Sequence, residues 1–144
     1  MGDSRAYLLH EGTLIRVTCD HSYVEELVDA GEITADEARV HPNRSVITRA
    51  LGSDPAMYAD HFTLHIEEGD RLILCSDGLS SMIPDSDIEN IATQSSSAQI
   101  CVDNLVDAAL AAGGHDNVTV VVVDLVDDGV MREAKRVRRR NVTI

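Results

Sequence analysis

Aromatic residues are scarce in this chain of 144 residues, which has no Trp, one Phe and three Tyr. The core must therefore be built from aliphatic side chains, and a hydrophobic content of 44% suffices for one domain. Such cores are typical of proteins that mix helices and sheets. No apolar stretch approaches the length of about 18 residues that a membrane-spanning helix needs, and the N-terminus does not resemble a signal peptide. We therefore expect a soluble, cytoplasmic protein without a membrane span.

Cysteines are also few, and their number is odd. The three are Cys19, Cys75 and Cys101, and two of them lie within apolar runs. Their spacing does not match that of a zinc site. We expect buried free thiols in a reducing compartment, with neither a disulfide nor a zinc ion.

Basic residues are outnumbered, since 12 Lys and Arg stand against 25 Asp and Glu and give a net charge of −13. Six basic side chains lie in the last thirteen residues, so residues 1–131 are still more acidic. A body this acidic argues against nucleic-acid binding, which needs clustered Lys and Arg. Its acids either keep the protein soluble or collect metal cations. We expect a domain at 1–126 and a mobile basic tail or linker at 127–144.

Alternating hydrophobicity and turn residues predict the strands. A hairpin is expected around Glu11-Gly12, with strands at 4–10 and 13–18. Residues 61–66 predict a half-exposed strand that pairs with the buried strand at 71–75. Residues 118–125 are apolar on both faces, which predicts a central strand in a sheet covered on both sides. Between these elements, residues 41–52 predict a loop that leads into a short strand.

Capping signals predict the helices. Ser22 and Glu25 have capping-box spacing at the start of a helix over 22–31, and Thr34 and Glu37 repeat that spacing in a second capped turn. A helix over 85–94 has the same signal at Ser86. The helix expected over 98–112 gathers small and aliphatic residues on one face and ends at a Gly-Gly pair.

Two aspartates at strand ends are the candidate functional residues. Asp77 follows the buried run at 71–75 and precedes Gly78, while Asp116 precedes the strand at 118–125. If the two strands are antiparallel neighbours, both carboxylates lie at the same end of the sheet. Two such charges repel strongly unless a cation or a proton lies between them, and Mn²⁺ or Mg²⁺ is the cation that suits oxygen ligands. The alternative is two unrelated turn residues, because Asp-Gly is also an ordinary turn pair.

Five blocks, in this order and spacing, resemble the PP2C-type metal-dependent serine/threonine protein phosphatases, especially the bacterial ones. The blocks are GDSRAYLL from Gly2, DHS from Asp20, HPNRSVITRALG from His41, LILCSDGL from Leu72 and GGHDNVTVVVV from Gly113. The resemblance covers residues 2–125. It implies an α+β fold, a β-sandwich flanked by helices in α-β-β-α layers, with a flap at about 20–52. It also implies hydrolysis of phosphoserine and phosphothreonine in proteins, opposing a serine/threonine kinase, by a metal-activated water.

The same resemblance implies roles for individual residues. Asp77 and Asp116 match the family's metal-binding aspartates, which act in catalysis through Mn²⁺ or Mg²⁺. Asp3 is similar to the aspartate that helps to hold an additional metal ion. The flap block contributes Ser45, beside that position, and three residues that we expect to be structural or to contact substrate, namely His41, Arg44 and Arg49.

The chain departs from the family pattern at its start. It has no counterpart of the preceding section, which in the family carries a phosphate-contacting arginine and the aspartate that bridges the two catalytic metals. It therefore resembles the C-terminal, larger part of the domain. We expect little or no activity from the isolated chain, and open sheet edges that favour self-association.

Two other interpretations remain. A haloacid dehalogenase-type phosphatase also has an aspartate after an apolar strand, but it needs a second aspartate two residues later, where this chain has Leu79. A phosphatase-like module that binds a partner without turnover is the non-enzymatic alternative.

Overall fold

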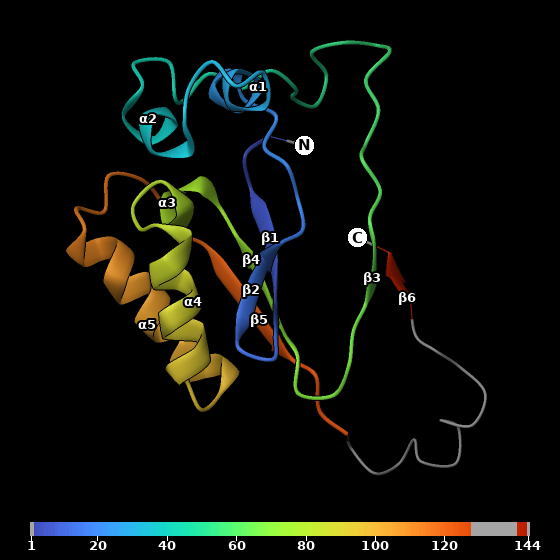
Figure 1. Cartoon of the computed structure of the whole chain (residues 1–144), viewed down its shortest axis with the longest axis vertical. Coiled ribbons are helices and arrows are strands. Elements are labelled where there is room, and N and C mark those ends of the chain that lie inside the picture. The colour runs from blue at the N-terminus through green and yellow to red at the C-terminus, as the bar shows by residue number, and fades with distance from the viewer. Residues whose placement is uncertain (1, 128–140, 144) are drawn as a thin grey trace.

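The computed structural model describes residues 2–127 and the backbone of residues 141–143. At its centre is a four-stranded sheet in the order β2-β1-β4-β5, in which every neighbouring pair is antiparallel. Its strands are β1 (Arg5–His10), β2 (Thr13–Arg16), β4 (Arg71–Cys75) and β5 (Val120–Asp124). Figure 1 shows α4 (Asp85–Gln94) and α5 (Ala98–Ala111) together on one face of this sheet. The expected α+β class is confirmed.

The β1–β2 hairpin forms where its turn signal lies. Glu11 and Gly12 both have positive φ, at 48° and 80°, as the two central residues of a type I′ hairpin turn require. Gly12 adopts this conformation without a steric penalty. The turn fixes the register in which Tyr7 faces Arg16 and His10 faces Thr13.

Two of the three predicted capping signals are confirmed. Ser22 accepts a hydrogen bond from the Glu25 amide at the start of α1 (Tyr23–Asp29), and Thr34 forms a complete capping box with Glu37 at α2 (Ala35–Val40). The third is wrong, because α4 begins at Asp85 with Pro84 at its N-cap.

The carboxylate expected in that third box has a different partner. Glu89 accepts a hydrogen bond from the Leu14 amide at 2.8 Å and so ties α4 to the hairpin. Because α4 starts at Asp85, Ser86 is not the N-cap residue. The Glu89 carboxylate binds the amide of Leu14 in β2 instead.

The prediction that the strand at 61–66 pairs with the strand at 71–75 is wrong. β3 (Thr63–His65) pairs with β6 (Asn141–Thr143) and not with β4. β4 has no free edge for it, since Ile73 is already opposite Tyr7 on one side and Val122 on the other. The end of the expected mobile tail is therefore a strand, while residues 128–140 lie outside the described part of the chain.

The strand expected at the centre of the sheet is an edge strand among the described residues. β5 alternates between partly buried and exposed residues, and Val121 and Val123 are 48% and 45% exposed. The helices cover only one face of the sheet, so valines on the other face stay accessible. The prediction of a strand covered on both sides is wrong for the described part of the chain, which contributes only the β3–β6 pair beyond the main sheet.

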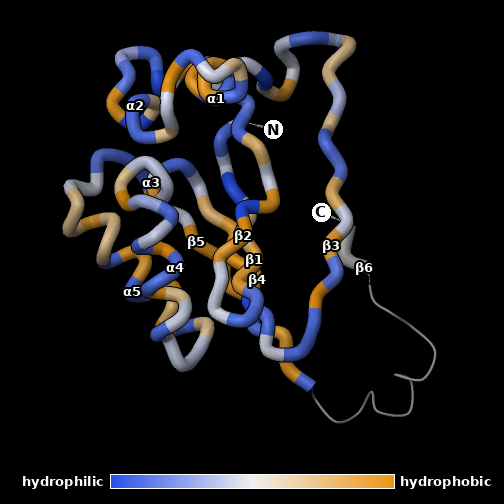
Figure 2. Tube along the Cα trace, in the orientation of Figure 1, coloured by the Kyte–Doolittle hydropathy of each residue, from blue (hydrophilic) through white to orange (hydrophobic). Residues whose placement is uncertain are grey.

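The core lies between the sheet and the helices α3 (Asp77–Ser80), α4 and α5. Figure 2 shows hydrophobic residues concentrated along the strands β1, β4 and β5. The largest fully buried side chains are Tyr7, Ile73, Leu79, Ile88, Cys101 and Leu105. Cys75 is also buried, which raises the pKa of its thiol to about 11. The prediction of buried free thiols is confirmed for Cys75 and Cys101, whereas Cys19 is exposed.

The connection between β2 and β4 contrasts with this core. Of residues 25–69, none is buried. The short strand expected after the loop at 41–52 is reduced to a single bridge between Ser22 and Ile47. Figure 1 shows α1 and α2 above the end of the sheet, followed by a long segment that descends to β3 on the side away from α4 and α5.

Candidate metal centre

Asp77 begins a short helix rather than a simple turn. β4 ends at Cys75, Ser76 is the N-cap residue, and Asp77 is the first residue of α3. The adjoining glycine has no room for a side chain, since a Cβ atom on Gly78 would lie 2.3 Å from the carbonyl oxygen of Asn117. Gly78 is required here by close packing of two backbone segments and not by an unusual φ.

The same contact brings the loop of Asp116 beside Asp77. The Ser76 amide donates to the Thr119 carbonyl oxygen at 3.0 Å, and the Ser76 hydroxyl donates to the carbonyl oxygen of Asn117 at 3.3 Å. β4 and β5 are antiparallel, with Cys75 opposite Val120. The two strands are thus antiparallel neighbours, the condition under which Asp77 and Asp116 lie at the same end of the sheet. The Asp116 carboxylate itself accepts a hydrogen bond from the Asn117 amide at 2.6 Å.

Asp3 lies at this end of the sheet too. Arg5 is opposite Cys75 in the β1–β4 ladder, so the residue two positions before Arg5 lies close to the start of α3. The pKa of Asp3 is raised, first by burial and then by the negative charge of Asp77. The negative charge of Asp77 thus opposes the ionisation of Asp3, and a bound cation would relieve this opposition.

The donor set of these aspartates fits a hard divalent cation. Mg²⁺ and similar ions commonly use one or two carboxylates and keep several bound waters, and a pair of aspartates such as Asp3 and Asp77 offers ligands of this kind. Within residues 2–127 there is no group of three or more His, Cys, Asp or Glu side chains already arranged to hold a metal. The loop of Asp116 therefore packs beside Asp77, but the Asp116 carboxylate does not form a three-ligand group with Asp3 and Asp77.

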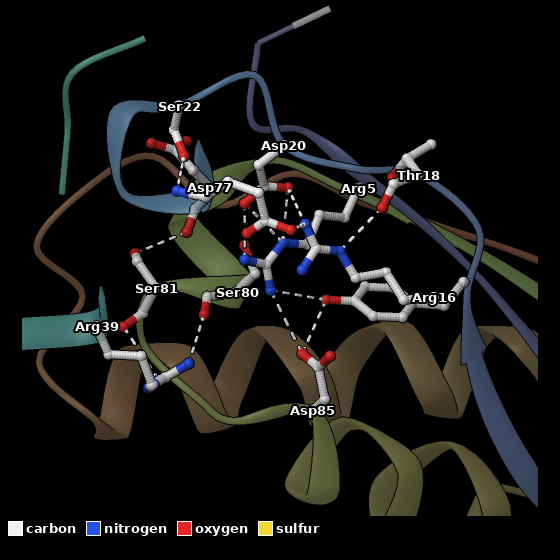
Figure 3. Close-up of polar contacts among 12 residues, drawn as sticks. Arg5, Arg16, Thr18, Asp20, Ser22, Arg39, Asp77, Ser80, Ser81 and Asp85 are labelled. Carbon is white, nitrogen blue, oxygen red and sulfur yellow. Dashed lines mark hydrogen bonds and ion pairs between the residues drawn. The ribbon is translucent and has the colours of Figure 1, made fainter. Parts of the chain in front are cut away.

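A partly buried network of ion pairs lies beside Asp77, as Figure 3 shows. The carboxylate of Asp20 accepts hydrogen bonds from Arg5, the shortest at 2.7 Å, and also pairs with Arg16 at 2.8 Å. Arg16 pairs in addition with Glu25 at 2.9 Å. Burial opposes the charged form of Arg5, but the hydrogen bonds that Arg5 donates to the Asp20 carboxylate raise the pKa of Arg5 overall.

This network gives the Asp20 carboxylate two cationic partners, Arg5 and Arg16. Its side chain is only 8% exposed, and a buried carboxylate needs such partners. The sequence contained the signal, because Arg5 and Asp20 lie in the GDSR and DHS blocks. Their pairing could not be read from the sequence, since fifteen positions separate them.

A second contact that sequence reasoning missed joins the flap to α3. Arg39 in α2 donates to the carbonyl oxygens of Ser80 at 3.0 Å and Ser81 at 3.4 Å (Figure 3). The Ser81 hydroxyl in turn donates to the Asp77 carbonyl oxygen at 2.7 Å. The flap helix thus contacts the C-terminal end of the helix that begins with Asp77.

The predicted flap residues lie in the turns after α2. Arg44 and Ser45 are exposed, and the ring of His41 accepts a hydrogen bond from the Asn43 amide at 3.1 Å. Within the described residues, no hydrogen bond or ion pair links these three side chains to the candidate acids. Their roles stay predictions.

The antiparallel sheet and the acids at its end can be compared with known protein families. The model of the SpoIIE family (stage II sporulation protein E) matches residues 27–126. The chain therefore belongs to the SpoIIE/PP2C family of phosphatases, as the resemblance of its five blocks implied. Within the described residues, none of the helices has the length and apolarity to cross a bilayer.

Curated relatives and solved structures agree with this family. The serine/threonine phosphatase stp of Listeria welshimeri is 40% identical over 124 residues, which are 86% of this chain and 49% of the relative. PstP of Mycobacterium tuberculosis, a serine/threonine protein phosphatase, is 46% identical over 130 residues, 88% of this chain and 24% of that protein. The chain thus spans about half or less of the length of these relatives.

Two solved structures are close in fold. The PPM Ser-Thr phosphatase MsPP of Mycobacterium smegmatis, in complex with cacodylate, superimposes with a TM-score of 0.77 and is 46% identical. The match covers 87% of this chain and 53% of the MsPP chain. The catalytic domain of PstP in complex with two manganese ions has a TM-score of 0.73 and 40% identity, with coverage of 88% and 52%.

Proposed function

We propose that this chain is part of a protein phosphatase that removes phosphate from phosphoserine and phosphothreonine residues, with Mn²⁺ or Mg²⁺ held by Asp77, Asp116 and Asp3. The observation that carries the proposal is the antiparallel pairing of β1, β4 and β5, which places Asp3, Asp77 and the loop of Asp116 at one end of the sheet. It occurs in a chain whose relatives are serine/threonine phosphatases and include one solved with two manganese ions. By the same likeness, the substrates are phosphorylated proteins and the enzyme opposes a serine/threonine kinase in the cytoplasm.

A divalent cation at these carboxylates supplies an activated water and neutralises phosphate oxygens. The chain's own residues hold the carboxylates in place for it. The packing of Gly78 on Asn117 keeps the loop of Asp116 next to α3, and the Arg5–Asp20 pair supports the start of β1, two residues after Asp3. Ser45, Arg44 and His41 are proposed to lie near the substrate, on the exposed turns of the flap.

Metal binding tests this proposal without requiring turnover. Calorimetric titration of the chain with Mn²⁺ should show binding that Asp77→Asn weakens at least tenfold, because loss of a charged ligand removes the main attraction for the cation. Asp107→Asn is the matched control, since it removes one exposed carboxylate from the surface of α5. Indistinguishable isotherms for wild type and Asp77→Asn would remove the metal site.

A phosphatase-like binding module is the second candidate function. It is favoured by the fact that residues 2–127 hold no ready-made cluster of three metal ligands. We propose that these 144 residues hydrolyse p-nitrophenyl phosphate slowly, because a site with few ligands binds its metal weakly. Robust Mn²⁺-dependent turnover by the pure chain would exclude the binding-module function, and complete inactivity with intact Mn²⁺ binding would favour it.

A further inference from the structure

A cluster of polar side chains joins three segments of the chain at the edge of the flap. His21 Nε2 lies 2.7 Å from Asp60 Oδ2, and Arg49 donates to Asp60 Oδ1 at 2.9 Å. The Arg49 guanidinium also lies over the ring of Tyr58, 4.5 Å from its centroid. We call Asp60, His21 and Arg49 the Asp60 clasp. Each oxygen of the Asp60 carboxylate therefore has its own cationic or polar partner.

The backbone of the clasp meets the residue that precedes Asp3. The Gly2 amide donates to the Arg49 carbonyl oxygen at 3.1 Å, and the His21 amide donates to the Gly2 carbonyl oxygen at 2.9 Å. The Thr48 amide donates to the His21 carbonyl oxygen at 2.8 Å, so His21 is hydrogen-bonded through its backbone to both Gly2 and Thr48. Gly2 is thus held on both sides by the two residues whose side chains Asp60 binds.

Apolar packing contributes little to holding segment 46–60 in place. No residue from 25 to 69 is buried, so segment 46–60 is not anchored by a hydrophobic core. The His21 side chain is only 11% exposed, and within the described residues its Nδ1 has no hydrogen-bond partner. Asp60 is therefore the side chain that orients this ring, and hydrogen bonds to a charged group are the stronger kind.

We propose that Asp60 is a positioning residue that fixes Asp3 through His21, Arg49 and the backbone of Gly2. The inference rests on the proposed function, since it assigns Asp3 to the metal centre. Groups that orient a metal ligand without touching the metal commonly matter for affinity, because a ligand that must be ordered on binding binds more weakly. Asp60 makes no contact with the candidate acids, so its effect must pass through the Gly2–Asp3 backbone.

Mn²⁺ titration of the full chain tests this role. Asp60→Ala should weaken Mn²⁺ binding about tenfold, the scale observed when outer-shell partners of metal ligands are removed. Asp54→Ala is the matched control, because Asp54 lies in the same exposed segment and its carboxylate accepts only a local hydrogen bond from the Ala56 amide at 2.8 Å. An equal loss in Asp54→Ala would trace the effect to net charge and overturn the proposal.

A double-mutant cycle separates positioning from general damage to the fold. In an Asp3→Asn background, Asp60→Ala should have no further effect on Mn²⁺ affinity, since the residue through which it acts is already lost. A persisting tenfold effect would overturn the proposal. Asp60→Asn, which preserves the shape of the side chain, should raise amide hydrogen exchange at His21 and Thr48 while the thermal midpoint stays unchanged. Unaltered exchange at both amides would also contradict it.

The two proposals fail in different ways. If Asp77→Asn and Asp60→Ala both leave Mn²⁺ binding unchanged, the metal site itself is absent. If Asp77→Asn abolishes binding and Asp60→Ala does not affect it, the metal site stands and the positioning role of Asp60 is wrong.

Discussion

The sheet with its helices and the segment of residues 25–69 are stabilised in different ways. The sheet and α3, α4 and α5 enclose a continuous apolar core in which six large side chains are fully buried. The segment 25–69 has no buried residue and is held by caps, arginine contacts and the Asp60 clasp. Apolar burial gives a cooperative, rigid unit, whereas exposed polar contacts give a segment that can open locally. The acids lie where these two regions meet.

The sharpest test of this difference uses one substitution in both regions. Leu105→Ala in α5 should lower the free energy of unfolding by about 2–5 kcal/mol, because it empties a fully buried site. Leu51→Ala should change it by less than about 0.5 kcal/mol, since Leu51 is 83% exposed. Urea denaturation of both variants gives the comparison, and equal losses would show that the flap shares the core.

The contact between α3 and the loop of Asp116 is the next test. Gly78→Ala should cost about 1–3 kcal/mol, because the new methyl group forces the Asn117 backbone away. It should also weaken Mn²⁺ binding by separating the acids. Gly12→Ala strains a positive φ with open space around it, so it should reduce stability and leave Mn²⁺ binding intact. Unchanged Mn²⁺ affinity in Gly78→Ala would disconnect this packing from the site.

Helix caps in the two regions should differ in their global effect. Ser97→Ala removes the cap of α5 and should lower the free energy of unfolding by about 1 kcal/mol. Thr34→Ala removes the capping box of α2, where no residue is buried. It should increase hydrogen exchange within α2 and leave the urea midpoint unchanged. A shift of the midpoint in Thr34→Ala as large as that in Ser97→Ala would contradict local opening.

The smallest effect concerns pH at the junction of β1 with the turn before β4. His10 Nδ1 lies 2.7 Å from Asp70 Oδ1, and this hydrogen bond raises the pKa of His10. A raised pKa means that the folded state binds the proton more tightly, so the contribution is full below about pH 6.5 and is lost as pH rises through the folded-state pKa. His10→Gln should therefore lower the thermal midpoint at pH 5.5 but not at pH 9. A midpoint difference that does not depend on pH would refute the assignment.

Much of the local structure could be predicted from the sequence. The Glu11-Gly12 turn and the caps at Ser22 and Thr34 are as expected, because each depends on residues fewer than five positions apart. The predictions that failed depend on distant partners. Ser86 does not cap α4 because the helix starts at Asp85 and Glu89 binds the hairpin, and β3 finds β4 already paired on both edges.

The candidate site divides in the same way. Asp77, Asp116 and Asp3 are predicted from strand ends and from the order of the five blocks, and their shared end of the sheet follows from the antiparallel pairing of β1, β4 and β5. The supporting contacts were not predicted. Asp20 with Arg5, Arg39 with Ser80, and Asp60 with His21 join residues that are between 15 and 41 positions apart.

The sequence by itself determined the family, the elements and the acids, because hydrophobic periodicity, turn chemistry and motif order are local properties of the chain. Only the tertiary structure decided how the acids are supported. The pairing of β4 with both β1 and β5 brings Asp3 toward Asp77, and the absence of a side chain at Gly78 lets the loop of Asp116 approach. Which charged side chains pair depends on their distance and burial in the folded chain, and the order of residue types alone does not specify these.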